Sequence, residues 1–231
     1  MNRWALLTLP LAALACTETV ESSDIRTSGV YPEFRVVADG SGTSEASARL
    51  KVGGNDSNTF LDLQAGDRIE VSANGETRVL NSESDHRYSA RFPFDAAGTQ
   101  FSFAFIRSDQ DESAPQSVVS LPEPFALEMA TTEASRASGA VAFSWDPPGS
   151  GNIRWGVDGD CVWTEEGETP GDGDHSLGAE DVHAPASDEA ESCTVQLTAQ
   201  RGYSGSLDPA FTEGGENVAY QVRAHSFTST P

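Results

Sequence analysis

The sequence has very few positively charged side chains. Lysine occurs once, at Lys51, and 14 Lys and Arg residues stand against 36 Asp and Glu, which gives a formal net charge of −22 over 231 residues. Proteins bind nucleic acids through cationic patches that neutralise phosphates, and adhere to anionic lipids through basic clusters. The composition therefore argues against nucleic acid as a partner and against electrostatic adhesion to a membrane. A solvated acidic surface is the simplest interpretation.

Short motifs of catalysis are also missing. The chain has no GxSxG elbow, no HExxH, no phosphate-cradling GxxxxGK and no CxxC. The only histidines are His86, His175, His183 and His225. We therefore expect a protein that is not an enzyme. A pair of carboxylates for glycoside hydrolysis stays open, because their separation in space matters and not their spacing in the sequence.

Helical periodicity is nearly absent, whereas alternation of apolar and polar residues is widespread and indicates strands. Asn74-Gly75 is the strongest hairpin signal, because both residues tolerate the positive φ of a type I′ turn. Phe101, Phe103 and Phe105 share one face of a predicted strand, which is more typical of a core than of a ligand platform. The predicted strands cover 34–38, 46–52, 59–63, 68–72, 76–80, 87–94, 99–107, 117–121, 125–129, 141–145, 153–157 and 220–224.

Short strands with turns every 8 to 12 residues predict an all-β chain built from antiparallel β-sandwiches of immunoglobulin-like type. Pro122-Glu123-Pro124 is a stiff junction, because proline fixes φ and pushes the preceding residue into an extended conformation. The sequence thus predicts two domains, one over residues 31–122 and one over residues 123–231.

Part of the second half resembles the fibronectin type III family. Val141 to Trp145 alternates and ends in Asp146-Pro147-Pro148-Gly149, and Ile153 to Val157 alternates again. Tyr220 to Ala224 is similar to the penultimate strand of that family. Only Ser226 to Pro231 follow, which leaves little room for a closing strand. The resemblance supports a β-sandwich and not a homologous assignment.

The amino terminus has the form of an export signal. Arg3 precedes a run without charges from Leu6 to Ala15, which is too short to cross a bilayer as a mature helix. Cys16 follows, and the sequence then becomes polar. We expect a cleaved signal peptide over residues 1–15 and a flexible tether over residues 16–30.

Ala13-Leu14-Ala15-Cys16 resembles the lipobox of bacterial lipoproteins, although that family prefers Leu where Ala13 stands. The resemblance implies diacylglycerol on the Cys16 thiol, often with a further acyl chain such as palmitate on its amine, and therefore a lipid anchor in the cell envelope. Thr17, where Asp would mark retention in the inner membrane, favours the outer membrane. The alternative is an ordinary signal peptide with a cysteine there by chance.

If Cys16 carries lipid, Cys161 and Cys193 remain as a pair, and an even remainder in an oxidising compartment predicts a disulfide bond. The bond would close a loop of about 33 residues, for which the chain-entropy model gives roughly 3–4 kcal/mol of stabilisation. A metal-binding pair is the alternative, but no CxxC spacing supports it.

Residues 155–200 contain no Lys or Arg and are rich in carboxylates. Asp172 and Asp174, in Gly171-Asp172-Gly173-Asp174, are candidate Ca²⁺ ligands, because that cation takes six to eight oxygen ligands. His175 and His183 could join them in a transition-metal site. We favour a solvated acidic loop closed by the disulfide over either cation site.

Three functions fit these observations. The favoured one is a membrane-anchored surface lipoprotein that is not an enzyme and acts as a binding or structural module towards a protein or glycan, since loops and edges of a rigid scaffold commonly carry such roles. The second is an accessory subunit of an envelope complex, docking through an apolar patch. The third is a hydrolase without a recognisable motif, which would have a concave pocket with convergent polar groups.

Overall fold

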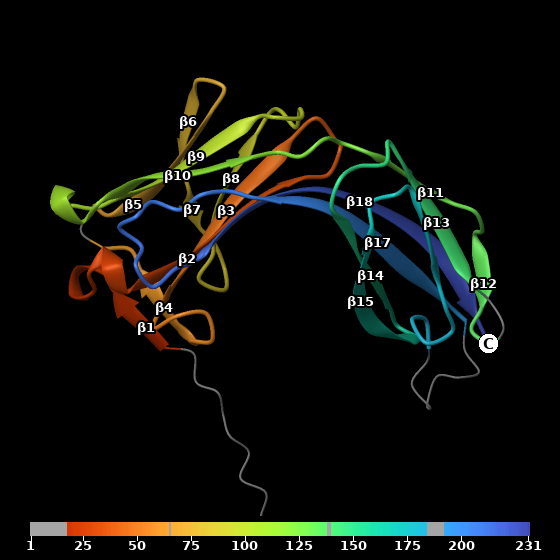
Figure 1. Cartoon of the computed structure of the whole chain (residues 1–231). Coiled ribbons are helices and arrows are strands. Elements are labelled where there is room, and N and C mark those ends of the chain that lie inside the picture. The colour runs from red at the N-terminus through yellow and green to blue at the C-terminus, as the bar shows by residue number, and fades with distance from the viewer. Residues whose placement is uncertain (1–17, 65, 138–139, 184–191) are drawn as a thin grey trace, which may run out of the picture.

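The computed structural model describes residues 18–64, 66–137, 140–183 and 192–231, and in these residues the regular secondary structure is almost entirely β-strand. Figure 1 shows an arch, with one large sheet along its concave side and two smaller sheets on its convex side. The first half contains β1 (Glu18–Glu21), β2 (Val30–Ala38), β3 (Ser44–Val52), β4 (Thr59–Asp62), β5 (Arg68–Ala73), β6 (Glu76–Val79), β7 (Asn81–Ser82), β8 (Tyr88–Phe92), β9 (Gln100–Ile106) and β10 (Ala114–Ser120). The second half contains β11 (Ala126–Met129), β12 (Glu133–Ser135), β13 (Val141–Asp146), β14 (Asn152–Gly159), β15 (Val162–Pro170), β16 (Asp174–Leu177), β17 (Cys193–Ser204) and β18 (Glu216–Thr230).

The large sheet has the strand order β1-β4-β3-β2-β18-β17-β14-β15, with β8, β7 and β12 attached to it. The order β10-β9-β5-β6 forms one smaller sheet, and β11-β13-β16 forms the other. Each smaller sheet faces the large one across a separate hydrophobic cluster. The predicted all-β fold of two packed sandwiches is therefore confirmed. Most pairings are antiparallel, but β1 with β4, β12 with β18 and β18 with β2 are parallel.

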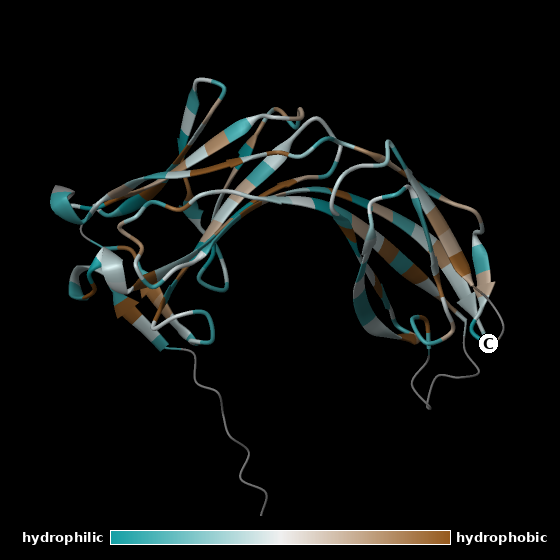
Figure 2. Ribbon diagram, in the orientation of Figure 1, coloured by the Kyte–Doolittle hydropathy of each residue, from teal (hydrophilic) through white to brown (hydrophobic). Residues whose placement is uncertain are grey.

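Apolar and polar side chains alternate along the strands, and the apolar ones form the first core, as the sequence predicts. Phe101, Phe103 and Phe105 of β9 are fully buried, so the aromatic stripe is core, and Phe103 stacks on Phe34 of β2 with ring centroids 4.6 Å apart. Figure 2 shows the same pattern as brown and teal bands that alternate along the strands. Asn74 has a φ of 47° in the turn between β5 and β6, as the predicted hairpin requires.

The second core is smaller and is centred on two tryptophans. Trp145 of β13 and Trp155 of β14 are 2% and 6% exposed, and they pack with Phe143, Ile153 and Leu197. Both tryptophans come from strands that alternate cleanly in the sequence. The predicted strands at 141–145 and 153–157 are thus confirmed.

One strand belongs to both sandwiches. The first part of β18 pairs in parallel with β2, from Glu216 opposite Glu33 to Gln221 opposite Ala38. Its later part continues beside β17, and Ala219 lies in the first core while Phe227 lies in the second. The strand predicted at 220–224, which resembled a penultimate strand, is therefore the middle of β18, which continues to Thr230 with no separate closing strand in the described residues after it. The two sandwiches share one continuous sheet. The predicted division into two domains at Pro122 remains a prediction.

Aromatic and cationic side chains fix the junction between the sandwiches. The ring of Phe125 lies between two guanidinium groups, with Cζ of Arg201 at 5.1 Å and Cζ of Arg223 at 5.4 Å from its centroid. Gln221 is fully buried and donates from its amide to the carbonyl of Asp95 at 2.9 Å. Burial lowers the pKa of Arg201 and of Arg223, because desolvation disfavours their charged form.

Two segments differ from their predicted form. The sequence predicts a flexible tether over 16–30, but β1 begins at Glu18 and two short 3₁₀ turns, Ser22–Asp24 and Thr27–Gly29, lead into β2. The sequence also predicts an acidic loop between the cysteines, but β15 and β16 lie there and pair with β14 and β13. β15 is buried on one face only, and glutamates at its exposed positions obscure the alternation of apolar and polar residues by which a strand is recognised. This explains the difference.

Among the described residues, no helix combines the length and the apolar composition that crossing a bilayer requires.

Candidate functional site

The predicted disulfide is present. Cys161, in the turn between β14 and β15, is bonded to Cys193 at the start of β17, with the two Cα atoms 5.7 Å apart. The bond joins the two ends of the acidic segment at the edge of the second core. Cys16, the predicted lipidation site, lies outside the described residues.

The carboxylates singled out as Ca²⁺ candidates are both exposed. Asp172 lies in the turn after β15, and Asp174 begins β16 opposite Ser144 of β13. No group of three or more His, Cys, Asp or Glu side chains in the described segments is arranged to hold a metal ion. His175 packs against Phe143 and Trp155, whereas the ring of His183 contacts the carbonyl of Glu180. The calcium and transition-metal sites remain predictions.

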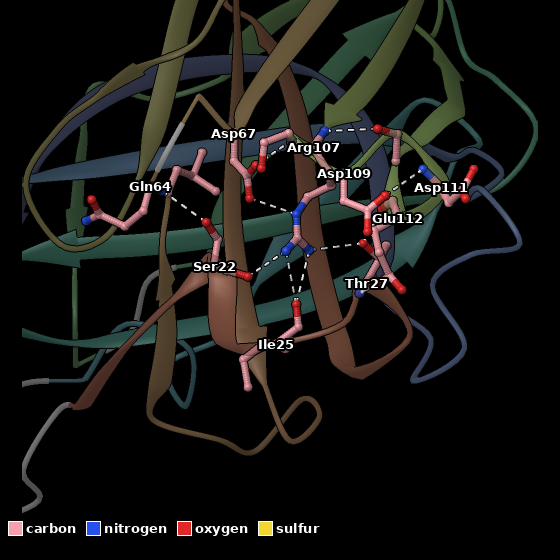
Figure 3. Close-up of polar contacts among 12 residues, drawn as sticks. Ser22, Ile25, Thr27, Gln64, Asp67, Arg107, Asp109, Asp111 and Glu112 are labelled. Atoms are coloured by element: carbon pink, nitrogen blue, oxygen red, sulfur yellow. Dashed lines mark hydrogen bonds and ion pairs between the residues drawn. The ribbon is translucent and has the colours of Figure 1, made fainter.

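A buried ion pair fastens the first residues of the folded chain to the first sandwich (Figure 3). Nε of Arg107 lies 2.7 Å from Oδ2 of Asp67, and both side chains are almost fully buried. The guanidinium also donates to the carbonyls of Ser22 and Ile25, at 2.5 and 3.1 Å, and to the hydroxyl of Thr27 at 3.2 Å. We call these five residues the Arg107 clamp.

Neighbouring groups complete the Arg107 clamp. The amide of Thr27 donates to Oε2 of Glu112 at 2.9 Å, and its hydroxyl donates to the Glu112 carbonyl. Burial alone would raise the pKa of Asp67. The backbone hydrogen bond from Ser108, the hydroxyl of Ser22 and the charge of Arg107 outweigh burial, so the pKa lies below its usual value.

The strand predictions missed this clamp, although the alternation of β9 carries a signal for it. Arg107 directly follows β9 and continues the two-residue spacing of Phe101, Phe103 and Phe105. Its side chain therefore lies on the same, core-facing side as these rings. A buried arginine needs a carboxylate and several acceptors, because an unpaired buried charge is strongly destabilising. The partner residues could not be read from the sequence, since Ser22 is 85 residues away.

The opposite, outward side of the large sheet is the concave face of the arch (Figure 1). We define it by the outward residues of β3, β2, β18, β17 and β14. Neighbouring strands place Arg49, Glu33 and Glu216 in one row across the sheet, and Ser47, Arg35 and Val218 in the next. Many of the scarce basic side chains lie on this face or beside it: Arg35, Arg49, Lys51 and Arg154 belong to its strands, and Arg87, next to β8, and Arg91, on β8, pair with Glu45 of β3.

Two of these rows border a hollow of about 230 Å³. The arginine hollow, as we call it, is lined by Glu33, Arg35, Ser47, Arg49, Arg87 and Glu216. Arg87 is held by Glu45 and Glu83, at 3.2 and 3.1 Å. Nζ of Lys51 lies 2.6 Å from Oε1 of Glu33.

Three charged groups of the arginine hollow have no such partner. In the part of the chain that the structure describes, Arg35, Arg49 and Glu216 form no ion pair. Nε of Arg49 is buried and has no hydrogen-bond acceptor among the described residues. Arg35 is oriented by the ring of Tyr220, with its Cζ 5.5 Å from the ring centroid. Glu216 lies opposite Glu33, and like charges directly opposite each other destabilise the pairing of two strands.

A second hollow of about 240 Å³ adjoins the first across Val218. The tyrosine hollow, as we call it, is lined by Asn152, Arg154, Glu168, Gln200 and Tyr220. Nη2 of Arg154 lies 2.5 Å from Oε2 of Glu166, so this guanidinium already has an ion-pair partner. The Tyr220 ring lies over Gly202 of β17, where an added Cβ would come within 2.7 Å of the ring. Glycine is therefore needed at 202 to let the ring lie flat against the sheet.

The sequence predicts four strands of the concave face, at 34–38, 46–52, 153–157 and 220–224, but it misses β17 and predicts none of the site residues. Arg35 and Arg49 stand at outward positions of predicted strands, and alternation alone places them there. That both lie in one hollow depends on the register between β2 and β3.

Comparisons with known proteins place the chain in no family. No family model matches it, and no curated protein matches it. Among solved structures, the chain is similar to a two-domain fibronectin type III segment from chicken tenascin, at 12% sequence identity. The match covers 85% of this chain and 97% of that chain, with a TM-score of 0.25. So low a score supports no conclusion about fold or function.

Proposed function

We propose that this protein is a lipid-anchored binding module of the bacterial cell envelope, without enzymatic activity, which presents the concave face of its large sheet to a ligand. The observation that carries the proposal is the pair of adjoining polar hollows, whose charged groups are left partly unpaired by the described residues of the protein itself. Buried polar groups normally find partners within a folded protein, so the buried Nε of Arg49, which has no acceptor among the described residues, favours an external ligand in this hollow.

The proposed anchor rests on Ala13-Leu14-Ala15-Cys16. The first described residue, Glu18, already lies in β1, and the Arg107 clamp holds the residues that follow. Lipid on Cys16 would therefore keep the sandwich close to the membrane surface, because only one residue separates that cysteine from β1. Outer-membrane attachment, favoured by Thr17, is part of the proposal.

The anchor is tested by growing the producing cells with labelled palmitate. We expect label on the protein and none on Cys16→Ala, because diacylglycerol and the added acyl chain both attach at residue 16. Cell fractionation should find the parent protein in the membrane and Cys16→Ala in another fraction or unprocessed. A parent protein without label would refute the anchor.

The concave face is tested by photo-cross-linking on intact cells. A photoreactive residue replaces Val218, between the two hollows, and in the control it replaces Val79, which is 48% exposed on β6 of a convex sheet. We expect cross-linked species from position 218 and few from position 79. The reverse result would favour the accessory-subunit alternative, in which another surface docks.

A hydrolase would also use a polar hollow, and Glu33 and Glu216 lie opposite each other on neighbouring strands. Glu33, however, is held by Lys51 at 2.6 Å, which leaves only Glu216 of the pair without a partner among the described residues. We therefore favour binding. Chemical change of a bound ligand during incubation with the purified protein would contradict this choice.

A further inference from the structure

We propose that the arginine hollow binds the carboxylate of an acidic sugar unit in a linear glycan, and that the tyrosine hollow holds the neighbouring unit. The inference deepens the proposed function and rests on the concave face being a binding surface. It names the ligand class that the chemistry of both hollows fits.

The arginine hollow offers two cations to an anionic group. Arg35 and Arg49 lie on neighbouring strands, border the same hollow and form no ion pair with a described carboxylate, although the chain has 36 Asp and Glu residues. The planar guanidinium group donates in pairs to carboxylate oxygens, and such charge-assisted bonds are the strong ones. Stacking on Tyr220 already orients Arg35, so little freedom is lost when a carboxylate binds.

Groups suited to hydroxyls lie beside these cations. Glu216 and the hydroxyl of Ser47 line the same hollow and can bond to hydroxyl groups of a ligand. A unit with one carboxylate and several hydroxyls, as in a uronic acid, meets both kinds of partner at once. An inorganic anion would leave the unpaired Glu216 carboxylate next to its own negative charge.

The two hollows are placed to hold successive units of a polymer. Each hollow, at about 230 and 240 Å³, is smaller than the roughly 300–1,000 Å³ typical of sites for drug-sized ligands. The two share Val218 as a wall, and the tyrosine hollow offers the amides of Asn152 and Gln200. Two small polar hollows side by side fit neighbouring units of a chain rich in hydroxyl groups.

A peptide fits this face less well. The strands that form it, β2, β18, β17 and β14, each have neighbours on both sides, so their backbone groups are already used and cannot pair with an added strand. Interfaces that bind by side chains are dominated by a few anchors, often Trp or Tyr, that fill well-packed pockets, whereas charged and amide groups dominate these two hollows.

The net charge of −22 does not exclude an acidic ligand. At physiological ionic strength the Debye length is about 8 Å, so carboxylates elsewhere on the protein are largely screened. Contacts within the hollow then decide the affinity. Because the bonds to the carboxylate are charge-assisted, binding should weaken moderately as salt is added.

The experiment measures binding of hexagalacturonic acid to the protein purified from its producing cells in mild detergent, by isothermal titration calorimetry at about 0.15 M salt, the physiological ionic strength. Maltohexaose, hexaglutamate and inorganic phosphate serve as comparison probes. We expect binding of hexagalacturonic acid, and much weaker binding of the neutral sugar, of the acidic peptide and of phosphate.

Matched variants locate the site. Arg49→Gln and Arg35→Gln should each weaken binding about tenfold or more, because each removes charge-assisted hydrogen bonds. Arg68→Gln, on β5 of a convex sheet, makes the same change in net charge and should leave the affinity unchanged. Thermal unfolding of all three variants shows whether a loss of binding reflects a loss of folding.

Equal binding of maltohexaose, tighter binding of hexaglutamate or phosphate, or no binding of hexagalacturonic acid would overturn the inference. Equal losses in Arg49→Gln and Arg68→Gln would overturn it as well, because the effect would then be one of net charge. Cross-links from position 218 on intact cells, without binding of hexagalacturonic acid, would leave the proposed function standing and remove only this ligand class.

Discussion

Removing the guanidinium at the centre of the Arg107 clamp should destabilise both sandwiches together. In Arg107→Met, an unbranched apolar chain replaces the stem of the arginine, and the carboxylate of Asp67, whose side chain is 2% exposed, loses its charged partner. The carbonyls of Ser22 and Ile25 lose their donor as well. Breaking a buried pair from one side costs about 3–5 kcal/mol, because an uncompensated buried charge remains.

For a chain of this length, each kcal/mol lowers the melting temperature by about 2–4 °C, so the expected drop is roughly 6–20 °C. Arg91→Met is the matched control. The Arg91 side chain is 81% exposed and lies 3.5 Å from Glu45, and exposed pairs of this kind contribute about 0–1 kcal/mol. Its melting temperature should stay within about 4 °C of the parent, by the same conversion.

The assay is urea unfolding followed in parallel by tryptophan fluorescence and by far-ultraviolet circular dichroism. Within the described residues all tryptophans belong to the second half of the chain, and the buried ones, Trp145 and Trp155, lie in the second core. Arg107 directly follows β9 and lies beside the first core. Because β18 passes through both sandwiches, we expect the tryptophan transition to move with the dichroism transition in Arg107→Met.

Two results would refute this reasoning. If only the dichroism signal moved and the tryptophan transition stayed in place, the sandwiches would unfold independently, and the shared sheet would not couple them. If neither transition moved by more than about 1 kcal/mol, the clamp would contribute no more than an exposed ion pair.

Three further predictions follow from named contacts. Replacing Cys161 and Cys193 together by Ser should lower the free energy of unfolding by about 3–4 kcal/mol in the chain-entropy model, because the bond spans 32 residues. Urea unfolding of the oxidised parent and of the variant measures this difference. Gly205→Ala should lower the free energy of unfolding by roughly 1–3 kcal/mol, because an added Cβ would lie 2.1 Å from the Val118 carbonyl oxygen. Gly29→Ala, where the nearest atom to an added Cβ lies at 3.7 Å, should leave the stability nearly unchanged, and thermal unfolding compares the two variants. The pKa of Asp67 is lowered on folding, so this carboxylate stabilises the fold above about pH 4 and the contribution is lost as the pH falls through the lowered pKa. Asp67→Asn should therefore be less stable than the parent at about pH 7, with a gap that narrows below about pH 4, and a gap that widened on acidification would contradict the sign.

Alternation predicted single strands with uneven success. It was sufficient for β9, because Phe101, Phe103 and Phe105 leave no doubt which face is buried. It failed for β15, where Glu165, Glu166 and Glu168 make an edge strand look like a loop. Acidic residues are common on edge strands, since they prevent pairing with other chains, and they erase the pattern used for prediction.

The Arg107 clamp shows a second kind of limit. The residues from Ser22 to Thr27 are mostly polar, with a composition typical of a tether. Their order comes from a guanidinium that donates to their carbonyls from 80 or more residues away along the chain. A local pattern cannot report such a partner, because nothing in residues 22–27 reveals which side chain will meet their carbonyls.

The sequence alone determined the all-β class, the faces buried in most strands, the hairpin at Asn74-Gly75 and the pairing of Cys161 with Cys193. These depend on local spacing or on the parity of cysteines, which can be counted along the chain. Only the tertiary structure decided that β18 serves two sandwiches and that Arg35, Arg49 and Glu216 share one hollow. Both depend on the register between strands far apart in the sequence, and that register is set by the packing of the whole sheet.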